Sequence, residues 1–196
     1  MLDIGLSAVA LALTWPVIAL AALIVRLDTA GPSFFRQTRL GKHGRRFTIV
    51  KLRGMYADAR ERFAHLYNYE LSDEEARRFH FHIEDDPRVT RVGHFFRKTS
   101  IDELPNFWNV LKGDMSLVGP RPQIPEMFPY YGPYKDVILS VRPGIFSLPK
   151  VSNRDDANLQ ETILADAYYV HHRSLGLDFK IILRGIAMVV LRRAVR

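Results

Sequence analysis

The segment IGLSAVALALTWPVIALAALIV, residues 4–25, decides the fold because it contains no charged residue. As a helix it is long enough to cross the roughly 30 Å hydrocarbon core of a bilayer. A secretory signal peptide begins with a basic region, whereas only the acidic Asp3 precedes this apolar run. We therefore expect residues 1–25 to be retained as a membrane segment.

Pro16 leaves two shapes open for this segment. Proline has no amide hydrogen, so the bond to the Ala12 carbonyl is lost and the ring opens that turn, which predicts a kink near Trp15 and Pro16. One interpretation is an ordinary kinked spanning helix, in which the Thr14 hydroxyl satisfies a freed carbonyl. The other is a re-entrant helix that returns to the side from which it entered.

Positive charge dominates the chain beyond the membrane segment. The whole sequence has 28 Lys+Arg and 21 Asp+Glu, a formal net charge of +7. Opposed only by Asp28, the cations that follow the segment are Arg26, Arg36, Arg39, Lys42, Arg45, Arg46, Lys51 and Arg53. The positive-inside tendency places this side in the cytoplasm. The net charge favours phosphates, acidic lipids or nucleic acid as partners, and the absence of cysteine excludes a disulfide framework or thiolate metal site.

The remaining residues predict one α+β catalytic domain that is mostly helical. FTIVKLR, residues 47–53, alternates as a strand does, and with FFRQTRL at 34–40 it predicts a hairpin turning at 41–44. This alternation puts Lys51 and Arg53 on one face, as a diphosphate grip or as a solvated strand edge. Residues 56–84 read as helix. DFKIILRGIAMVVLRRAVR, residues 178–196, predicts a helix that lies on an anionic membrane surface or packs in the core with a basic end.

The residues that carry chemistry lie between 85 and 125, around Asp102 and Glu103. Ser100 to Glu103 matches a helix capping box, and a helix that begins there would also attract phosphate. An ionised carboxylate can attack phosphorus while a neighbouring carboxylate holds Mg²⁺. Basic residues just upstream would admit an anionic diphosphate, namely Arg88, Arg91, Arg97 and Lys98.

Arg121 is the second candidate for phosphate binding. It stands in Gly119-Pro120-Arg121-Pro122, where the flanking prolines restrict the backbone. The guanidinium would then clamp a phosphate or nucleotide, or the loop would have a purely structural role.

Several motifs taken together resemble a known family. They are FFRQTRLG, FTIVKLRGM, DPRVTRVG, RKTSIDELPNFWNVLKGDMSLVGPRP and VRPGI. In this order they are similar to the bacterial sugar transferase family, the monotopic phosphoglycosyltransferases or polyprenyl-phosphate sugar-1-phosphate transferases. The resemblance runs from the apolar start to Lys180, and the single apolar run matches the small, minimal type.

The resemblance implies a reaction on the cytoplasmic face of the bacterial inner membrane. A UDP-sugar would give its sugar 1-phosphate to polyprenyl (undecaprenyl) phosphate and release UMP, as the first membrane step of glycoconjugate assembly. Asp102 would be the nucleophile, and Glu103 would bind the Mg²⁺ cofactor. Phosphates or the nucleotide would contact Lys51, Arg53, Arg88 and Arg121.

The resemblance also implies an organisation of the chain. A re-entrant helix at 1–25 would precede a catalytic domain at 26–178 and a basic amphipathic membrane-surface helix at 179–196. Membrane lipids are then partners, nucleic acid is not, and a homodimer is one open arrangement. The rival functions are a membrane-tethered module that binds nucleic acid or anionic lipid in a salt-dependent way, and a polytopic transferase, which needs many spanning segments.

The sequence departs from the family pattern at several positions. Asp3 lacks a preceding basic pair, and Trp15 stands before the breaking proline where serine is usual. Gly54 replaces a usual serine and Asn106 a usual glutamine. Phe146–Arg154 is poorer in glycine than the family segment, which we expect to affect the sugar pocket. The sugar and the pathway stay open.

Overall fold

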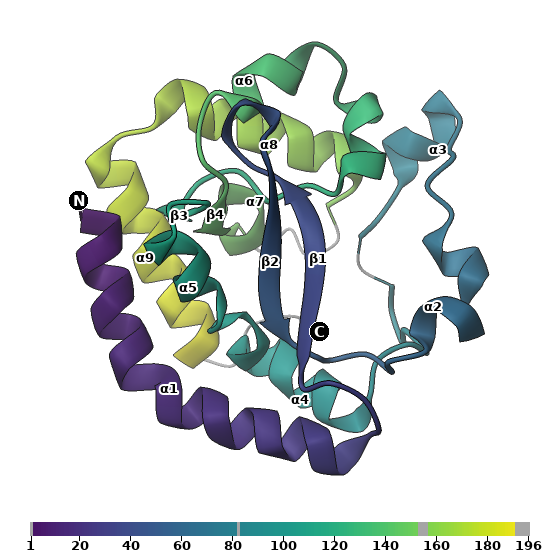
Figure 1. Cartoon of the computed structure of the whole chain (residues 1–196). Helices are drawn as coiled ribbons and strands as arrows, with labels where there is room; N and C mark the ends of the chain where they lie inside the picture. The colour runs from purple at the N-terminus through teal and green to yellow at the C-terminus, as the bar shows by residue number, and fades with distance from the viewer. Residues whose placement is uncertain (1, 82, 153–156, 191–196) are drawn as a thin grey trace.

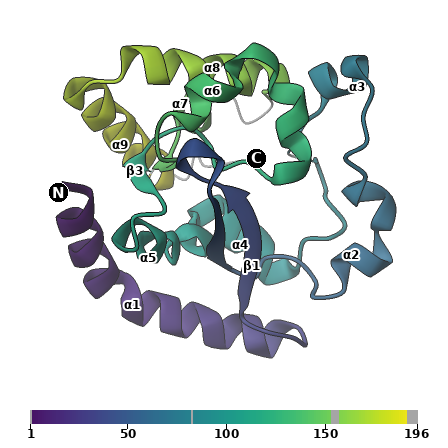
Figure 2. The same cartoon turned by 45° about the horizontal axis from the view of Figure 1, so that its top comes forward.

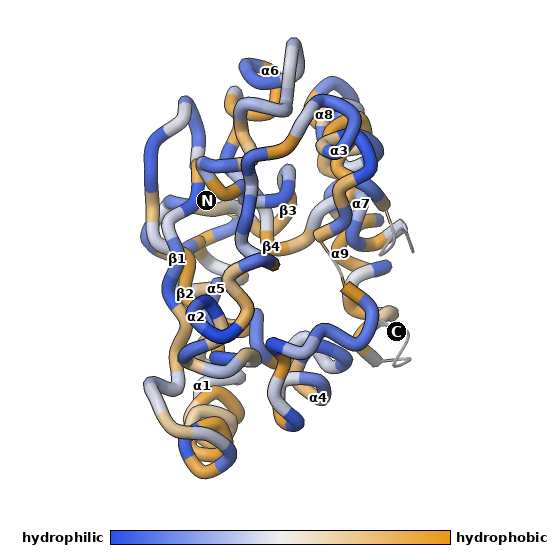
Figure 3. The backbone as a smooth tube through the Cα atoms, turned by 90° about the vertical axis from the view of Figure 1, so that its right-hand side faces the viewer, coloured by the Kyte–Doolittle hydropathy of each residue, from blue (hydrophilic) through white to orange (hydrophobic). Residues whose placement is uncertain are grey.

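A computed structural model describes residues 2–81, 83–152 and 157–190 (Figure 1). Its first element is a single helix, α1 (Leu2–Asp28), which is long and apolar enough to cross a membrane. Only Ser7, Ala21 and Val25 of this helix are buried. Figure 3 shows α1 as a largely hydrophobic stretch of the tube. The predicted apolar helix is confirmed.

α1 bends about midway along its length and follows one side of the domain (Figures 1 and 2). Pro16 lies inside this helix, as the predicted kink requires. The Thr14 hydroxyl donates to the Ala10 carbonyl at 2.7 Å, one turn back along the helix. The helix is therefore bent rather than straight, although it stays helical throughout.

Both ends of α1 contact the same domain. Near the amino end, the Asp3 carboxylate accepts a hydrogen bond of 2.7 Å from the Ser116 hydroxyl. Near the other end, Val25 packs in a small apolar cluster with Leu52 and Phe96. The helix thus lies against the domain at two places far apart in sequence.

The predicted hairpin is confirmed. β1 (Phe34–Leu40) pairs antiparallel with β2 (Arg46–Leu52), across the turn η1 (Lys42–Gly44). Asn109 of α5 (Asn106–Leu111) fastens that helix to the hairpin, because its side chain accepts from the Val50 amide at 3.3 Å and donates to the Thr48 carbonyl at 2.7 Å. The turn that precedes α5 is thereby held beside β2.

A second small sheet, absent from the sequence prediction, organises the main core. β3 (Ser116–Val118) and β4 (Gly144–Phe146) run parallel. A Cβ atom at Gly144 would lie 2.1 Å from the Gly119 nitrogen, so the close approach of the two segments requires glycine. The core around this sheet joins the hairpin to the last two helices through Phe47, Ile49, Val110, Met115, Leu117, Val118, Ile145, Val151, Tyr169 and Ile181.

The remaining helical elements are short except for the last two. They are α2 (Ala59–Arg62), η2 (Ala64–Tyr67), α3 (Asp73–Arg78), α4 (Arg91–Thr99), η3 (Ile101–Glu103), η4 (Pro125–Tyr134), α6 (Lys135–Leu139), α7 (Leu148–Val151), α8 (Leu159–His172) and α9 (Leu175–Val190). The predicted helix at 56–84 is wrong in extent, since three short helices with turns between them fill this region. A capping box between Ser72 and Glu75 starts α3, and Phe79 ends it in extended geometry.

α9 has one face in the core and one apolar face exposed. Ile181 is buried, and Gly185 lies so close to Phe146 that a Cβ there would be 2.4 Å from the ring. Large apolar side chains stay exposed along the other face at Leu175, Phe179, Leu183, Ile186 and Val189. The predicted helix is confirmed, beginning a few residues earlier than expected. Its basic residues Arg192, Arg193 and Arg196 lie outside the described residues.

Candidate active site

The turn between α4 and α5 presents Asp102 and Glu103. Ser100 ends α4 in the left-handed conformation, with φ 54°, and the 3-10 turn η3 follows. The predicted capping box is wrong, because Ser100 makes no side-chain cap bond and the Glu103 side chain binds two lysines instead. Ser100 is at once the residue that ends α4 and the residue before η3, and its left-handed backbone, instead of the extended one usual at a capping residue, accompanies the missing side-chain cap.

α4 is held tightly against the end of β2, which fixes this turn in place. The Thr90 hydroxyl caps the helix by accepting from the Gly93 amide at 2.9 Å. A Cβ at Gly93 would stand 1.9 Å from the Gly54 carbonyl oxygen, so the two backbones touch. Any larger residue at 93 would push α4, and with it the carboxylates, away from the strand.

Glu103 is the centre of a three-segment ion cluster. Its Oε1 accepts a hydrogen bond of 2.9 Å from Lys51 Nζ of β2, and its Oε2 accepts one from Lys150 Nζ of α7. Burial opposes ionisation of Glu103, but the ammonium groups of Lys150 and Lys51 outweigh burial and hold its pKa below the ordinary value. Glu103 is therefore a carboxylate that stays charged.

Asp102 is shifted the opposite way. Burial, followed by the charge on Glu103, raises the pKa of Asp102 to about 6, against the opposing effects of Lys51, Lys150 and Arg97. At pH 7 such a group is about nine-tenths ionised and more basic than an ordinary aspartate. A charged, basic carboxylate is what nucleophilic attack at phosphorus requires.

Arg88 and Arg97 both lie close to the Asp86 carboxylate. Arg88 donates from Nε and Nη2 to the two oxygens of Asp86, each at 2.8 Å, and both residues are buried. Arg97 Nη1 lies 3.9 Å from Asp86, and its charge also acts on Asp102. The structure therefore commits Arg88 to Asp86, whereas Arg97 acts electrostatically on both Asp86 and Asp102.

Arg53 binds a different partner from Lys51. Its guanidinium donates to the Pro32 carbonyl at 2.7 Å and to the hydroxyl and carbonyl of Thr29 at 2.9 and 2.8 Å. β2 ends at Leu52, so strand alternation does not extend to residue 53. Lys51 faces Glu103, whereas Arg53 fastens the connection between α1 and β1.

Arg121 lies in a separate polar region. Its backbone amide donates to the Asp166 carboxylate at 3.2 and 3.3 Å, and its guanidinium lies 5.0 Å from the centre of the Phe81 ring. Among the described residues, no hydrogen-bonded partner is found for this guanidinium. Asp166 is fully buried, and burial raises its pKa to about 8.

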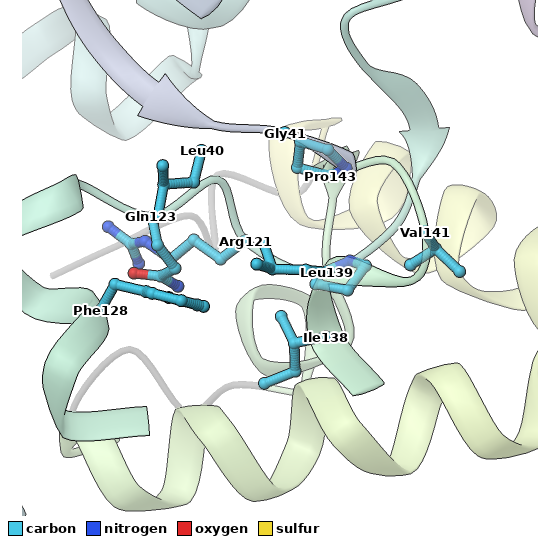
Figure 4. Close-up of a pocket in the computed structure, with 10 residues that line it drawn as sticks. Leu40, Gly41, Arg121, Gln123, Phe128, Ile138, Leu139, Val141 and Pro143 are labelled. Atoms are coloured by element: carbon cyan, nitrogen blue, oxygen red, sulfur yellow. The ribbon is translucent and has the colours of Figure 1, made fainter. Parts of the chain in front are cut away.

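The pocket beside Arg121 is too small for a substrate. In Figure 4 the side chains of Arg121, Gln123 and Phe128 lie at one end of it and Val141 at the other. Its volume is 10 Å³, about one water molecule. Nothing in this pocket connects Arg121 to Asp102.

The sequence prediction omitted Lys150 and gave Arg97 no role of its own. Lys150 lies in Phe146–Arg154, which was expected to affect the sugar pocket, and Arg154 is outside the described residues. The only local signal for Lys150 is a cation in a segment that departs from the family pattern. The signal for Arg97 is that it lies in the last turn of α4, shortly before Asp102.

The fold and the site together define a class: an α+β domain fastened to an apolar helix, with a carboxylate pair among basic side chains. The sequence matches the family model described as bacterial sugar transferase over residues 1–192. The chain belongs to this family.

Named relatives agree with this membership. The galactosyl transferase CpsE of Streptococcus agalactiae is 42% identical over 168 residues, 85% of this chain and 36% of that protein. Undecaprenyl-phosphate galactose phosphotransferase of Salmonella typhimurium is 39% identical over 163 residues, 83% of this chain and 34% of that protein. UDP-glucose:undecaprenyl-phosphate glucose-1-phosphate transferase of Caulobacter vibrioides is 38% identical over 193 residues, 94% of this chain and 67% of that protein. The chain thus spans about a third of the first two relatives.

Proposed function

We propose that this protein transfers a sugar 1-phosphate from a UDP-sugar to a polyprenyl phosphate such as undecaprenyl phosphate, and releases UMP. The observation that carries the proposal is the pair of adjacent carboxylates in the turn after α4, where Glu103 is bound by Lys51 and Lys150 and Asp102 stands beside it. Opposite directions of the pKa shifts, raised for Asp102 and lowered for Glu103, agree with this geometry. One acid is suited to attack and the other to remain charged. The relatives' names supply the substrate classes.

The reaction proceeds in two displacements at one phosphorus atom. An Asp102 carboxylate oxygen forms a bond to the β-phosphorus of the donor, and the bond from that phosphorus to the bridging oxygen breaks. UMP leaves with the bridging oxygen and its electron pair. A phosphate oxygen of the polyprenyl phosphate then attacks the same phosphorus, which frees the Asp102 carboxylate and yields the lipid-linked sugar diphosphate.

Basic side chains offset the charge of the diphosphate in both steps. Lys51 lies at the carboxylate pair, and Arg121 has its guanidinium exposed for phosphate or nucleotide. Arg53 and Arg88 already bind chain atoms and would contact phosphate only through their remaining N–H groups. Arg97 joins this set because its charge already acts on Asp102.

Mg²⁺ fits the donor set at the turn. The described residues contain no cluster of three or more His, Cys, Asp or Glu, but Mg²⁺ usually takes one or two carboxylates and completes its shell with phosphate oxygens and water. Glu103, which is kept ionised, would hold it, with Asp102 adjacent. The ion would neutralise charge on the diphosphate.

The membrane arrangement that we propose is a re-entrant α1 on the cytoplasmic face of the inner membrane. Its support is the bend at Pro16 together with the contacts of Asp3 and Val25 to one domain. A straight spanning helix would have to separate Asp3 from Ser116. The exposed apolar stripe of α9 would lie on the same surface.

The topology is testable with single cysteines, since the sequence has none of its own. Leu2→Cys and Lys42→Cys should both react with an impermeant thiol reagent from the cytoplasmic side only. Periplasmic labelling at position 2 would show a spanning helix. Pro16→Ala should move that position towards the periplasm, because it restores the missing helical bond.

The covalent step is tested by leaving out the acceptor. Radiolabelled UDP-sugar should label the protein and release a roughly stoichiometric amount of UMP, and Asp102→Asn should take up no label. With both substrates, double-reciprocal plots should be parallel. Intersecting lines, with no labelled protein and no UMP before the acceptor is added, would replace this mechanism with direct transfer between the two substrates.

A further inference from the structure

Lys150 is fixed at its backbone and able to move at its tip. It follows β4 on the single-turn helix α7, between Pro149 and Val151, which are both buried. Its own side chain is 30% exposed and reaches Glu103 Oε2 through a four-carbon stem. The ammonium group can therefore leave Glu103 without any change in the backbone.

The cluster holds more positive than negative charge. Glu103 takes an ammonium group on each oxygen, from Lys51 and from Lys150, and the charge of the adjacent Asp102 is the second negative charge of the cluster. Arg97, whose charge also acts on Asp102, is a third cation, so three positive charges face the two negative charges of Asp102 and Glu103. Such an excess is unfavourable in a half-buried site unless an anion arrives, which suits a diphosphate.

Both oxygens of Glu103 are therefore occupied by the chain itself. A divalent cation that binds Glu103 must displace at least one ammonium group, because like charges at a shared carboxylate repel. Lys51 belongs to a strand whose one edge pairs with β1 and whose other edge is held by Asn109. Lys150 belongs to a single turn, so it is the more easily displaced of the two.

We propose that Lys150 occupies the cation position on Glu103 while the site is empty, and that it turns to the donor diphosphate when a divalent cation takes this carboxylate. The first half concerns the empty protein alone. The second half rests on the proposed function, because it names the diphosphate as the group that receives the ammonium.

Manganese titration of the full-length protein in detergent tests the first half. Free Mn²⁺, measured by electron paramagnetic resonance, reports binding without any turnover. Lys150→Gln should bind Mn²⁺ about fivefold more tightly than the wild type, because one competing charge is gone. Lys150→Arg, which keeps the charge, should bind as the wild type does.

Lys112→Gln is the matched control, since Lys112 also pairs with a carboxylate, that of Asp114 at 2.9 Å. It should leave Mn²⁺ binding unchanged. Thermal unfolding of each variant checks the fold, and Lys150→Met serves if the glutamine variant does not fold. Equal or weaker Mn²⁺ binding by a folded, uncharged variant at position 150 would overturn the proposal.

Binding of UDP at saturating Mg²⁺, measured by calorimetry, tests the second half. Lys150→Gln should bind UDP about tenfold more weakly than the wild type, opposite in sign to its effect on Mn²⁺. Unchanged UDP binding would show that Lys150 does not contact the diphosphate. If the wild type bound no UDP and took up no label, the transferase function itself would fail, while the Mn²⁺ result would still decide whether Lys150 competes for Glu103.

Discussion

Glu103, in the turn after α4, and Asp166, in α8, are both carboxylates withdrawn from water near basic residues. Two ammonium groups bind Glu103 and keep its pKa low. Within the part of the chain that the structure describes, Asp166 accepts a hydrogen bond only from the Arg121 backbone amide, and burial raises its pKa to about 8. Burial without a bound cation thus leaves a neutral acid at pH 7 that holds the loop around Arg121, whereas burial with two cations leaves a charged one.

Asp102 stands between these extremes. It shares burial with Asp166 and a charged neighbourhood with Glu103, so its pKa of about 6 leaves it ionised yet basic. The turn after α4 is therefore suited to the reaction, whereas the region around Asp166 has a structural role. Charge is needed at the turn after α4, and only a hydrogen-bond acceptor is needed at Asp166.

The largest expected effect comes from neutralising one acid in each region. Asp102→Asn keeps the size of the side chain but removes the charge, so sugar-phosphate transfer should fall by more than about a thousandfold. Asp166→Asn keeps an acceptor for the Arg121 amide, so transfer should stay within about threefold of the wild type. UMP release measures both rates, and circular dichroism verifies the fold. Near-normal turnover of Asp102→Asn would show that another group is the nucleophile.

Features that depend on residues adjacent in the sequence could be predicted from the sequence alone. The apolar helix with its proline, the hairpin and the Asp102–Glu103 pair are all local patterns, and the first two are confirmed. Lys150 was missed because it meets Glu103 only through the packing of α7, far along the chain. The parallel pair β3 and β4 was missed for the same reason.

The corrections have equally local causes. Ser100 both ends α4 and precedes η3 in a left-handed conformation, and it makes no side-chain cap bond although the sequence matches a capping box. Because β2 ends at Leu52, Arg53 does not share the strand face of Lys51, and it binds Thr29 whereas Lys51 binds Glu103. Backbone geometry at a single residue decided each case, and residue type alone does not specify that geometry.

A smaller effect is expected from pH on the covalent step. Asp102 must be ionised to attack, and its pKa in the free protein is about 6. At UDP-sugar concentrations well below saturation, where the rate reports the free protein, labelling should fall about tenfold for each pH unit below that value. Glu103 stays charged over the same range because its pKa is lowered. Single-turnover labelling between pH 4.5 and 8 measures the profile. A rate that stays flat down to pH 4.5 would mean that Asp102 ionises as an exposed aspartate does, which would remove the contrast with Glu103.

The smallest effect concerns stability, and it isolates Asp166. Its pKa is raised to about 8 in the folded protein, from about 4 in an unfolded chain, so the folded state holds a proton that the unfolded state has lost. The stabilisation from that proton is complete below about pH 4 and disappears as pH rises through about 8, because unfolding releases the proton in between. Tyr131, whose charge interacts with that of Asp166, does not titrate between pH 6 and 8, because burial raises its pKa well above the ordinary value. The wild type should therefore lose about 2 kcal/mol relative to Asp166→Asn over this range, as measured by urea unfolding of both proteins. If the unfolding free energies of the two proteins ran parallel between pH 6 and 8, Asp166 would already be ionised at pH 6. Asp166 and Glu103 would then both be charged carboxylates, and the contrast between the two regions would be lost.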